Sequence, residues 1–158
     1  MSLRIGQGID IHRFSDDPGR ALVLGGVTIT GGPGLDGHSD ADVVCHAVAD
    51  ALLGAAGLGD LGAHFADDDE RWRGADSTGL LTAVVERVAA AGWRPVNVDC
   101  TVVTETPKLA PHVAAMTARL TEVLGAPASV KATRAEGLGA IGRVEGMACL
   151  AVALIESE

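Results

Sequence analysis

Near its start the chain alternates polar and apolar side chains along residues 3–12. Asp10 and His12 occupy even positions, and the apolar side chains occupy odd ones: Ile5, Ile9 and Ile11. Residues two apart on a β-strand point to the same face of the sheet. We therefore predict a strand over residues 3–12 on which Asp10 and His12 share one face and can reach one ligand together.

A helical pattern follows over residues 41–55. Its apolar stripe repeats at spacings of three and four, and consists of Val44, Ala47, Val48, Ala51 and Leu52. On another face Asp42, His46 and Asp50 recur every four residues. We expect Ser39 or Asp40 to cap this helix and Asp42 to lie in its first turn. The free N–H groups of that turn are then expected to point towards whatever binds there.

Asp10, His12 and His46 form a candidate divalent-metal site. One carboxylate and two imidazoles can hold zinc and leave a coordination position open, which is what a catalytic metal needs. The same spacing is equally compatible with a half-solvated strand beside an ordinary helix, whose polar side chains merely face water. The residues by themselves leave both interpretations open.

The remaining patterns predict one α+β domain over residues 1–158. An extended run at 21–29 is interrupted by Gly25-Gly26, and helices are expected from Asp76 or Ser77 to Gly92 and from Pro111 to Gly125, with strands at 96–102, 129–133 and 147–155. This order fits a mixed β-sheet with helices packed on one face. The run at 147–155 is continuously apolar, so we expect it to be covered on both faces, by helices or by another subunit.

Composition excludes several classes of partner. The formal net charge of −9 at pH 7 argues against nucleic acid, whose binding depends on cationic contacts to phosphate, and against an anionic membrane surface.

The three cysteines are far apart and odd in number, which favours buried thiols in a reducing compartment over a disulfide framework. Neither a signal peptide nor a membrane-spanning apolar stretch is visible, so a cytoplasmic protein is expected.

Several sequence blocks together carry a family resemblance. They are RIGQGIDIH at 4–12, GHSDADVVCH at 37–46, DALLGAAGLGDLG at 50–62, Pro107-Lys108 and GRVEG at 142–146. Their order and spacing resemble the 2-C-methyl-D-erythritol 2,4-cyclodiphosphate synthase family of the non-mevalonate isoprenoid pathway. The blocks extend nearly from end to end, and their combination is far more specific than any one of them.

The resemblance implies conversion of 4-diphosphocytidyl-2-C-methyl-D-erythritol 2-phosphate to the 2,4-cyclodiphosphate. The 2-phosphate attacks the nearer (β) phosphorus of the diphosphate, and CMP leaves. It also implies Zn²⁺ at Asp10, His12 and His46, and a second ion, Mg²⁺ or Mn²⁺, that bridges the substrate diphosphate through Glu136. The family assembles as a homotrimer whose active sites lie between subunits.

The resemblance further implies roles for single residues. His38 and Arg134 stand at catalytic positions, Lys108 at the cytidine nucleotide and Arg143 near a central threefold cavity where isoprenoid diphosphates can sit. The implied substrate-binding set is Asp10, His12, His38, Ser39, Asp60, Leu61, Gly62, Phe65, Asp67, Asp69, Thr104, Lys108, Leu109, Ala132, Thr133, Glu136 and Arg143.

This chain departs from the family pattern at a few positions. Arg134 replaces the middle of three threonine-like residues, Gly137 stands where lysine is common, Ala140 where an aromatic residue is common, and Ile9 replaces a frequent aromatic. The leading hypothesis is the cyclising phosphorus–oxygen lyase. The alternative suggested by Arg134 is a non-catalytic member of the fold that binds a nucleotide or an isoprenoid diphosphate. A zinc-dependent phosphoesterase ranks third, because the sequence shows no evident general base for water.

Overall fold

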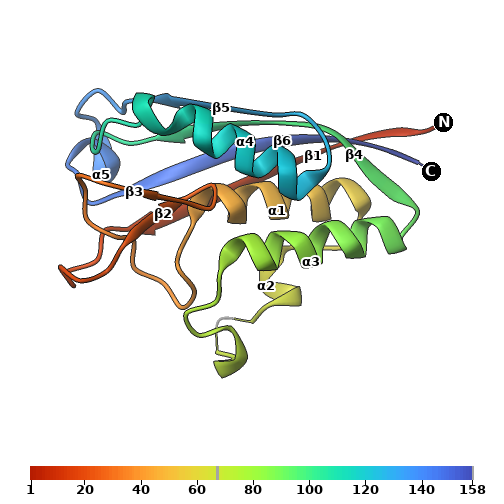
Figure 1. Cartoon of the computed structure of the whole chain (residues 1–158), viewed down its shortest axis with the longest axis horizontal. Helices are drawn as coiled ribbons and strands as arrows, with labels where there is room; N and C mark the ends of the chain where they lie inside the picture. The colour runs from red at the N-terminus through yellow and green to blue at the C-terminus, as the bar shows by residue number, and fades with distance from the viewer. Residues whose placement is uncertain (67, 158) are drawn as a thin grey trace.

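A mixed four-stranded sheet forms the centre of the fold (Figure 1). The computed structural model describes residues 1–66 and 68–157. The strands of the sheet are β1 (Leu3–Arg13), β4 (Trp93–Val103), β5 (Ala128–Thr133) and β6 (Gly146–Ser157). They lie in the order β1-β6-β4-β5, with β4 and β5 parallel and the other two pairs antiparallel. The predicted mixed sheet is confirmed.

The extended run at 21–29 forms a separate hairpin. Its strands β2 (Leu22–Leu24) and β3 (Val27–Ile29) pair antiparallel. Gly25 and Gly26 form the turn with φ of +56° and +73°. Positive φ at both central positions is typical of a two-residue hairpin turn, and glycine adopts it without steric cost. The glycine pair therefore turns the chain back on itself.

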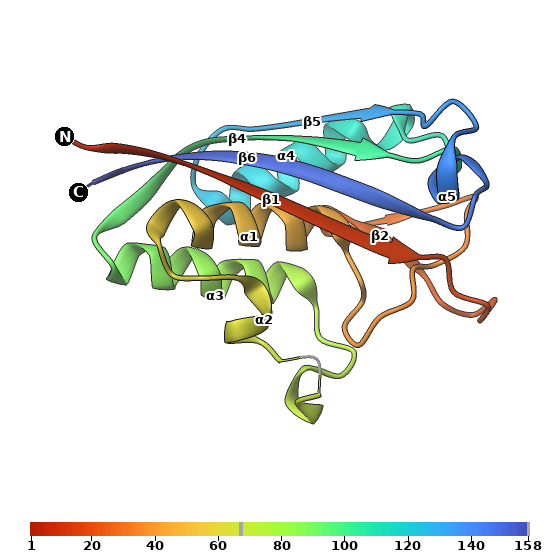
Figure 2. The ribbon, with the colours of Figure 1, turned by 180° about the vertical axis from the view of Figure 1, so that it is seen from behind.

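The helices gather on one side of the sheet. They are α1 (Val43–Ala56), α2 (Leu61–His64), α3 (Ser77–Ala90), α4 (Val113–Leu124) and α5 (Gly139–Gly142), with short 3₁₀ turns η1 (Glu70–Trp72) and η2 (Ala110–His112). α1 and α4 pack on the strands and α3 packs against α1 (Figures 1 and 2), which confirms the predicted layering. Pro111 lies in η2, so the third long helix begins at Val113 and not at Pro111. Among the described residues no helix is both long and apolar enough to cross a membrane.

The opposite face of the sheet carries exposed apolar side chains. In β1 the side chain of Ile5 is 72% exposed, and Ile9 and Ile11 are exposed beside it. Leu150 and Val152 of β6 are exposed on the neighbouring strand, which pairs with β1. The prediction that residues 147–155 are covered on both faces thus holds for one face within this chain, where helices bury alternate residues. A contiguous exposed apolar surface of this kind is typical of a protein contact.

Helix α1 begins at Val43 with Asp42 as its N-cap, so the predicted caps Ser39 and Asp40 were wrong. The Asp42 carboxylate is fully buried and accepts hydrogen bonds from the N–H groups of Val44 and Cys45. It also accepts from the N–H groups of Gly25 and Gly26 in the hairpin turn. The N–H groups of Val44 and Cys45 are therefore satisfied by the chain itself, and do not point towards a ligand as we expected.

Two glycines bring β1 into backbone contact with α1. A Cβ atom on Gly6 would lie 1.9 Å from the carbonyl oxygen of Ala51, and one on Gly8 would lie 2.0 Å from that of Ala47. Real Cβ atoms do not approach other atoms so closely, so only glycine fits at either position. This close approach places the next residues on the same face of β1 beside His46, one residue before Ala47 on the helix.

Candidate metal centre and active-site cavities

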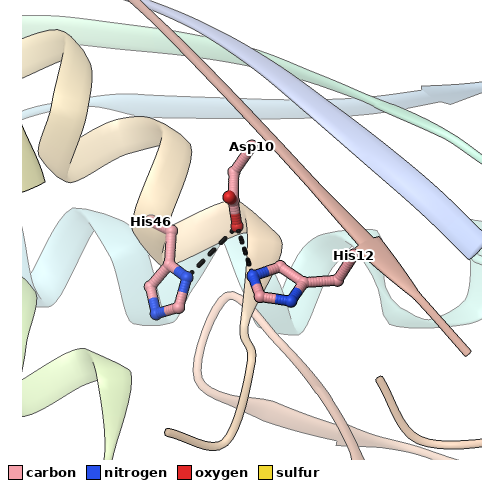
Figure 3. Close-up of side chains that lie close together, drawn as sticks. All are labelled: Asp10, His12 and His46. Atoms are coloured by element: carbon pink, nitrogen blue, oxygen red, sulfur yellow. Dashed lines mark hydrogen bonds and ion pairs between the residues drawn. The ribbon is translucent and has the colours of Figure 1, made fainter. Parts of the chain in front are cut away.

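Asp10, His12 and His46 converge from two elements. β1 supplies Asp10 and His12 on the face that meets the helix, and α1 supplies His46 from the end of its first turn (Figure 3). His12 Nε2 and His46 Nδ1 each lie 3.1 Å from the same carboxylate oxygen, Oδ2 of Asp10. One ligand atom from each of the three residues lies within 4.8 Å of the others, which is close enough for all three to hold one metal ion.

The second nitrogen of each imidazole contacts a different part of the chain. His12 Nδ1 lies 2.6 Å from the backbone carbonyl oxygen of Asp36. Because a carbonyl oxygen only accepts, His12 Nδ1 is the protonated nitrogen and donates this hydrogen bond. His46 Nε2 lies 2.9 Å from Ser77 Oγ and 3.3 Å from Ser39 Oγ. Both rings are therefore held at their outer edges and present the other nitrogen to Asp10.

The inner atoms of this group suit a cation. Burial raises the pKa of Asp10, but hydrogen bonds and charge from His12 and His46 outweigh it and hold that pKa well below its usual range. Asp10 is thus a carboxylate. When His12 is neutral, its Nε2 presents a lone pair to that carboxylate at 3.1 Å. Two acceptors at this distance repel unless a proton or a metal ion lies between them. One carboxylate oxygen and two imidazole nitrogens are a donor set that zinc uses in proteins, so the residues fit the expected ion.

The candidate metal centre opens into a cavity of about 330 Å³. Eight of the residues singled out from the sequence line it, namely Asp10, His12, His38, Ser39, His46, Leu61, Gly62 and Phe65. The ring of His38 is fixed by a 3.0 Å hydrogen bond from Nε2 to the carbonyl oxygen of Asp69. Ser39 is buried beside His46 and accepts from the N–H group of Ala41. The structure therefore brings His38, Ser39 and part of the loop at 60–69 together with the candidate metal centre.

Two predicted substrate-binding acids of that loop, Asp60 and Asp69, shape its backbone. Asp60 caps α2 and accepts from the N–H group of Ala63 at 2.8 Å. Asp69 caps η1 and pairs with Arg71, whose hydrogen bonds lower the pKa of Asp69. Both acids thus hold turns of the loop beside the cavity. Asp67, a further predicted substrate-binding residue, lies outside the described residues.

A second, separate cavity of about 480 Å³ collects the residues expected at the nucleotide. It is lined by Thr104, Lys108, Leu109, Ala132, Thr133 and Arg134, together with the loop that connects β4 to η2. The parallel pairing of β4 with β5 brings the two segments together, and the N–H group of Thr104 donates to the carbonyl oxygen of Thr133 at 3.0 Å. The predicted site is therefore divided between two cavities of one chain.

Arg134 is held at the edge of this second cavity by Glu105. Its Nε and Nη2 atoms donate to the same carboxylate oxygen at 2.9 and 2.7 Å. These hydrogen bonds lower the pKa of Glu105, which also accepts from the N–H group of Gly137. The guanidinium group is otherwise largely exposed. It is thus tethered beside the cavity and still available to an anion.

Two further predicted residues line neither of these cavities. Glu136 follows β5 in the left-handed region with φ of +54°, and its side chain is exposed. Arg143 follows α5 and pairs with Glu145 at 2.7 Å on the surface. The single chain does not join either residue to Asp10, His12 and His46.

Some residues at the site were not found from the sequence. Trp72 and Leu80 line the first cavity with Phe65, and the rings of Phe65 and Trp72 meet edge to face at 4.9 Å. Ser77 contacts His46, although in the sequence it reads only as a residue that starts a helix. An aromatic residue in an otherwise polar loop was the available signal for Trp72. No local pattern pointed to Ser77, because its contact spans 31 residues.

Known proteins match this chain over nearly its whole length. Residues 3–156 match the YgbB family. The 2-C-methyl-D-erythritol 2,4-cyclodiphosphate synthase of Salinibacter ruber is 56% identical over 98% of this chain and 99% of that protein. The protein of the same name from Laribacter hongkongensis is 55% identical over 99% of this chain and 98% of that protein.

Solved structures also match nearly the whole of this chain. The bifunctional IspDF of Campylobacter jejuni matches with a TM-score of 0.94 and 39% identity, over 99% of this chain but only 43% of that chain. The CDP complex of Plasmodium falciparum IspF matches with a TM-score of 0.85 and 30% identity, over 99% of this chain and 97% of that chain. The fold, the sequence blocks and the full-length matches lead to one conclusion: this chain belongs to the YgbB family, that of the 2-C-methyl-D-erythritol 2,4-cyclodiphosphate synthases.

Proposed function

We propose that this chain converts 4-diphosphocytidyl-2-C-methyl-D-erythritol 2-phosphate to 2-C-methyl-D-erythritol 2,4-cyclodiphosphate and releases CMP, as a phosphorus–oxygen lyase. The observation that carries the proposal is the group Asp10, His12 and His46, which opens into a cavity in a chain whose full-length relatives are named for this synthase. The CDP complex of a relative supports a cytidine ligand.

The proposed ions follow from the chemistry of the ligands. Asp10, His12 and His46 would hold Zn²⁺, and Glu136 would contribute to a Mg²⁺ or Mn²⁺ site at the substrate diphosphate, since such hard ions take oxygen ligands. When bound, the ions supply Lewis-acid polarisation of phosphate oxygens and neutralise their charge. The chain itself is strongly acidic, so it needs that neutralisation to accept a phosphorylated substrate.

The residues of the chain would act by orientation. The nucleophile is a phosphate of the substrate, so the protein needs only to bring that oxygen to the diphosphate and exclude water. His38 and Ser39 line the first cavity with fixed side chains, and His38 would contact a phosphate there. Arg134 would replace the usual threonine by offering a charged donor to the reacting phosphates, which binds them more strongly than a neutral one.

The second cavity would receive the cytidine nucleotide. Lys108 offers a cation there, and the ends of β4 and β5 offer backbone groups. Because the two cavities are separate in one chain, the second cavity of a neighbouring copy would lie beside the first. We propose a homotrimer for this reason. The exposed apolar face formed by Ile5, Ile9, Ile11, Leu150 and Val152 supports it, since contact between copies would remove this face from water.

The test is turnover followed by phosphorus NMR. Purified protein with Zn²⁺ and Mg²⁺ is mixed with the cytidylylated methylerythritol 2-phosphate. Two mutually coupled signals of a cyclic diphosphate, with one CMP per product, are expected. Unchanged substrate with retained nucleotide binding would favour the non-catalytic alternative, and linear phosphate products would favour a phosphoesterase. His46→Ala, treated in the same way, provides the control for metal dependence.

A further inference from the structure

The outer nitrogen of His46 contacts a hydroxyl group that in turn contacts a carboxylate. His46 Nε2 lies 2.9 Å from Ser77 Oγ, and Ser77 Oγ forms a short hydrogen bond with Oδ1 of Asp40. Ser77 is completely buried and begins α3, whereas His46 lies on α1. Neither Ser77 nor Asp40 belongs to the site residues that the sequence resemblance implies.

The hydroxyl group of Ser77 has one proton to donate, and this determines which atom is the donor in each of these hydrogen bonds. Asp40 accepts from three donors, because the N–H groups of Asp42 and Ser77 contact its carboxylate besides the Ser77 hydroxyl. A carboxylate only accepts, so the single hydroxyl proton of Ser77 goes to Asp40. Ser77 Oγ can then only accept from His46, so the proton of a neutral His46 is on Nε2. The lone pair of Nδ1 consequently faces Asp10 at 3.1 Å.

A hydrogen bond donated by Ser39 to His46 Nε2 is not an alternative to this arrangement. Its Oγ atom lies farther from His46 Nε2, at 3.3 Å, and already accepts from the N–H group of Ala41. If Ser39 donated to an unprotonated Nε2, that nitrogen and Ser77 Oγ would be two acceptors 2.9 Å apart. This arrangement is unfavourable as long as Asp40 holds the Ser77 proton.

We propose that Ser77 and Asp40 are positioning residues that hold His46 in the tautomer with Nδ1 facing the metal. These roles rest on the metal site of the proposed function and extend it to a second layer of residues. His12 has a matching partner, because its Nδ1 donates to the carbonyl oxygen of Asp36 and leaves Nε2 for the metal. Outer partners of this kind orient the ring and raise the basicity of the ligating nitrogen.

A purely structural role for Ser77 predicts a different result. Ser77 and Asp40 connect the starts of α1 and α3, so loss of the hydroxyl could weaken the fold without any effect specific to the metal. Thr78 provides a matched control. It is the next residue of α3, it is buried, and its hydroxyl group donates to Asp76 at 2.7 Å and not to His46. Thr78→Ala removes a hydroxyl group from the same turn and leaves the partner of His46 in place.

The experiment is a competition titration of Zn²⁺ against a chromophoric chelator, with the full-length chain. Ser77→Ala is expected to bind zinc on the order of 10–100-fold more weakly than the unsubstituted protein, the usual effect of losing an outer partner. Thr78→Ala is expected to bind zinc as the unsubstituted protein does. Unchanged affinity in Ser77→Ala, or equal weakening in both variants, would overturn the proposal.

Nitrogen NMR of the His46 ring gives a second, independent readout. In the zinc-bound unsubstituted protein, the proton is expected on Nε2 and the metal on Nδ1. Zinc bound through Nε2, with the proton on Nδ1, would overturn the proposal, even if Ser77→Ala did not fold. If the unsubstituted chain took up no zinc, the metal site of the proposed function would be wrong and this proposal would fall with it, whereas zinc bound through the other nitrogen would overturn this proposal alone.

Discussion

Gly8 of β1 lies so close to Ala47 of α1 that a Cβ atom on Gly8 would be 2.0 Å from the carbonyl oxygen of Ala47. Gly8→Ala must push the strand and the helix apart, and overpacking of this kind costs about 1–3 kcal/mol of folding free energy. Because His46 precedes Ala47, the same shift separates it from Asp10. We expect lower stability in urea unfolding together with weaker zinc binding.

The matched control for Gly8→Ala is Gly54→Ala in α1, the helix that Gly8 contacts. A Cβ atom there would lie 3.9 Å from the carbonyl oxygen of Gln7, an ordinary contact distance. Alanine inside a helix is more stable than glycine by about 0.5–1 kcal/mol. Gly54→Ala should therefore be neutral or stabilising, with unchanged zinc content. Equal destabilisation by both substitutions would contradict the importance of the close approach at Gly8.

His46→Ala is expected to lose zinc and turnover while the fold is retained. It removes one of three ligands, and the remaining carboxylate and imidazole hold the ion much more weakly. Elemental analysis after dialysis and the circular dichroism spectrum measure the two effects. His112→Ala, which changes a histidine on η2 outside the candidate centre, should keep its zinc. Stoichiometric zinc in His46→Ala would exclude His46 as a ligand.

Asp10 should make the metal-free protein sensitive to acid. Folding lowers the pKa of Asp10, because hydrogen bonds and charge from the His12 and His46 rings, when these rings are protonated, outweigh the opposing effect of burial. The carboxylate therefore contributes stability above its unfolded pKa of about 4, and this contribution is lost as the pH falls from there through the lower folded pKa. Urea unfolding at pH values below about 4 should show this slope, and Asp10→Asn should reduce it. Asp16→Asn, at an exposed position, should leave the slope unchanged.

Substitutions of Arg134 test whether this arginine contacts the phosphates in place of the usual threonine. Arg134→Ala should lower kcat on the order of 10²-fold, the usual effect of removing one donor to developing charge, with a smaller change in KM. Arg134→Thr should recover part of that loss. Arg119→Ala removes a partly exposed arginine that pairs with Glu122 on α4, and steady-state kinetics should show no effect. A kcat unchanged by Arg134→Ala would rule out a role for Arg134 in turnover.

The apolar face of the sheet should control assembly. Ile9→Glu places a charge in the middle of this face, where burial between copies would cost far more than exposure to water. We expect light scattering to show monomers in place of trimers, and turnover to disappear with the trimer. Ala89→Glu, at an exposed position of α3, should leave both unchanged. A monomeric unsubstituted protein with full activity would contradict the proposed shared site.

The sequence predicted those parts of the site that depend on local periodicity. Alternation along β1 placed Asp10 and His12 on one face, and helical spacing placed His46 on a helix, α1. The cap of α1 was mispredicted because Ser39, Asp40 and Asp42 can all cap a helix. Asp40 instead accepts from Ser77, 37 residues away. Such long-range contacts select among locally equivalent residues, and no local pattern reports them.

The buried carboxylate of Asp42 makes the hairpin of β2 and β3 a dependent element. Each strand has three residues, and an isolated two-stranded hairpin is only marginally stable in water. Its turn donates two N–H groups to Asp42, whose side chain is fixed by the start of α1. The turn therefore has its partner only after α1 has formed, and the two should open together as one cooperative unit. Amide hydrogens of Gly25 and Gly26 would then exchange with solvent no more readily than those of the helix they are attached to.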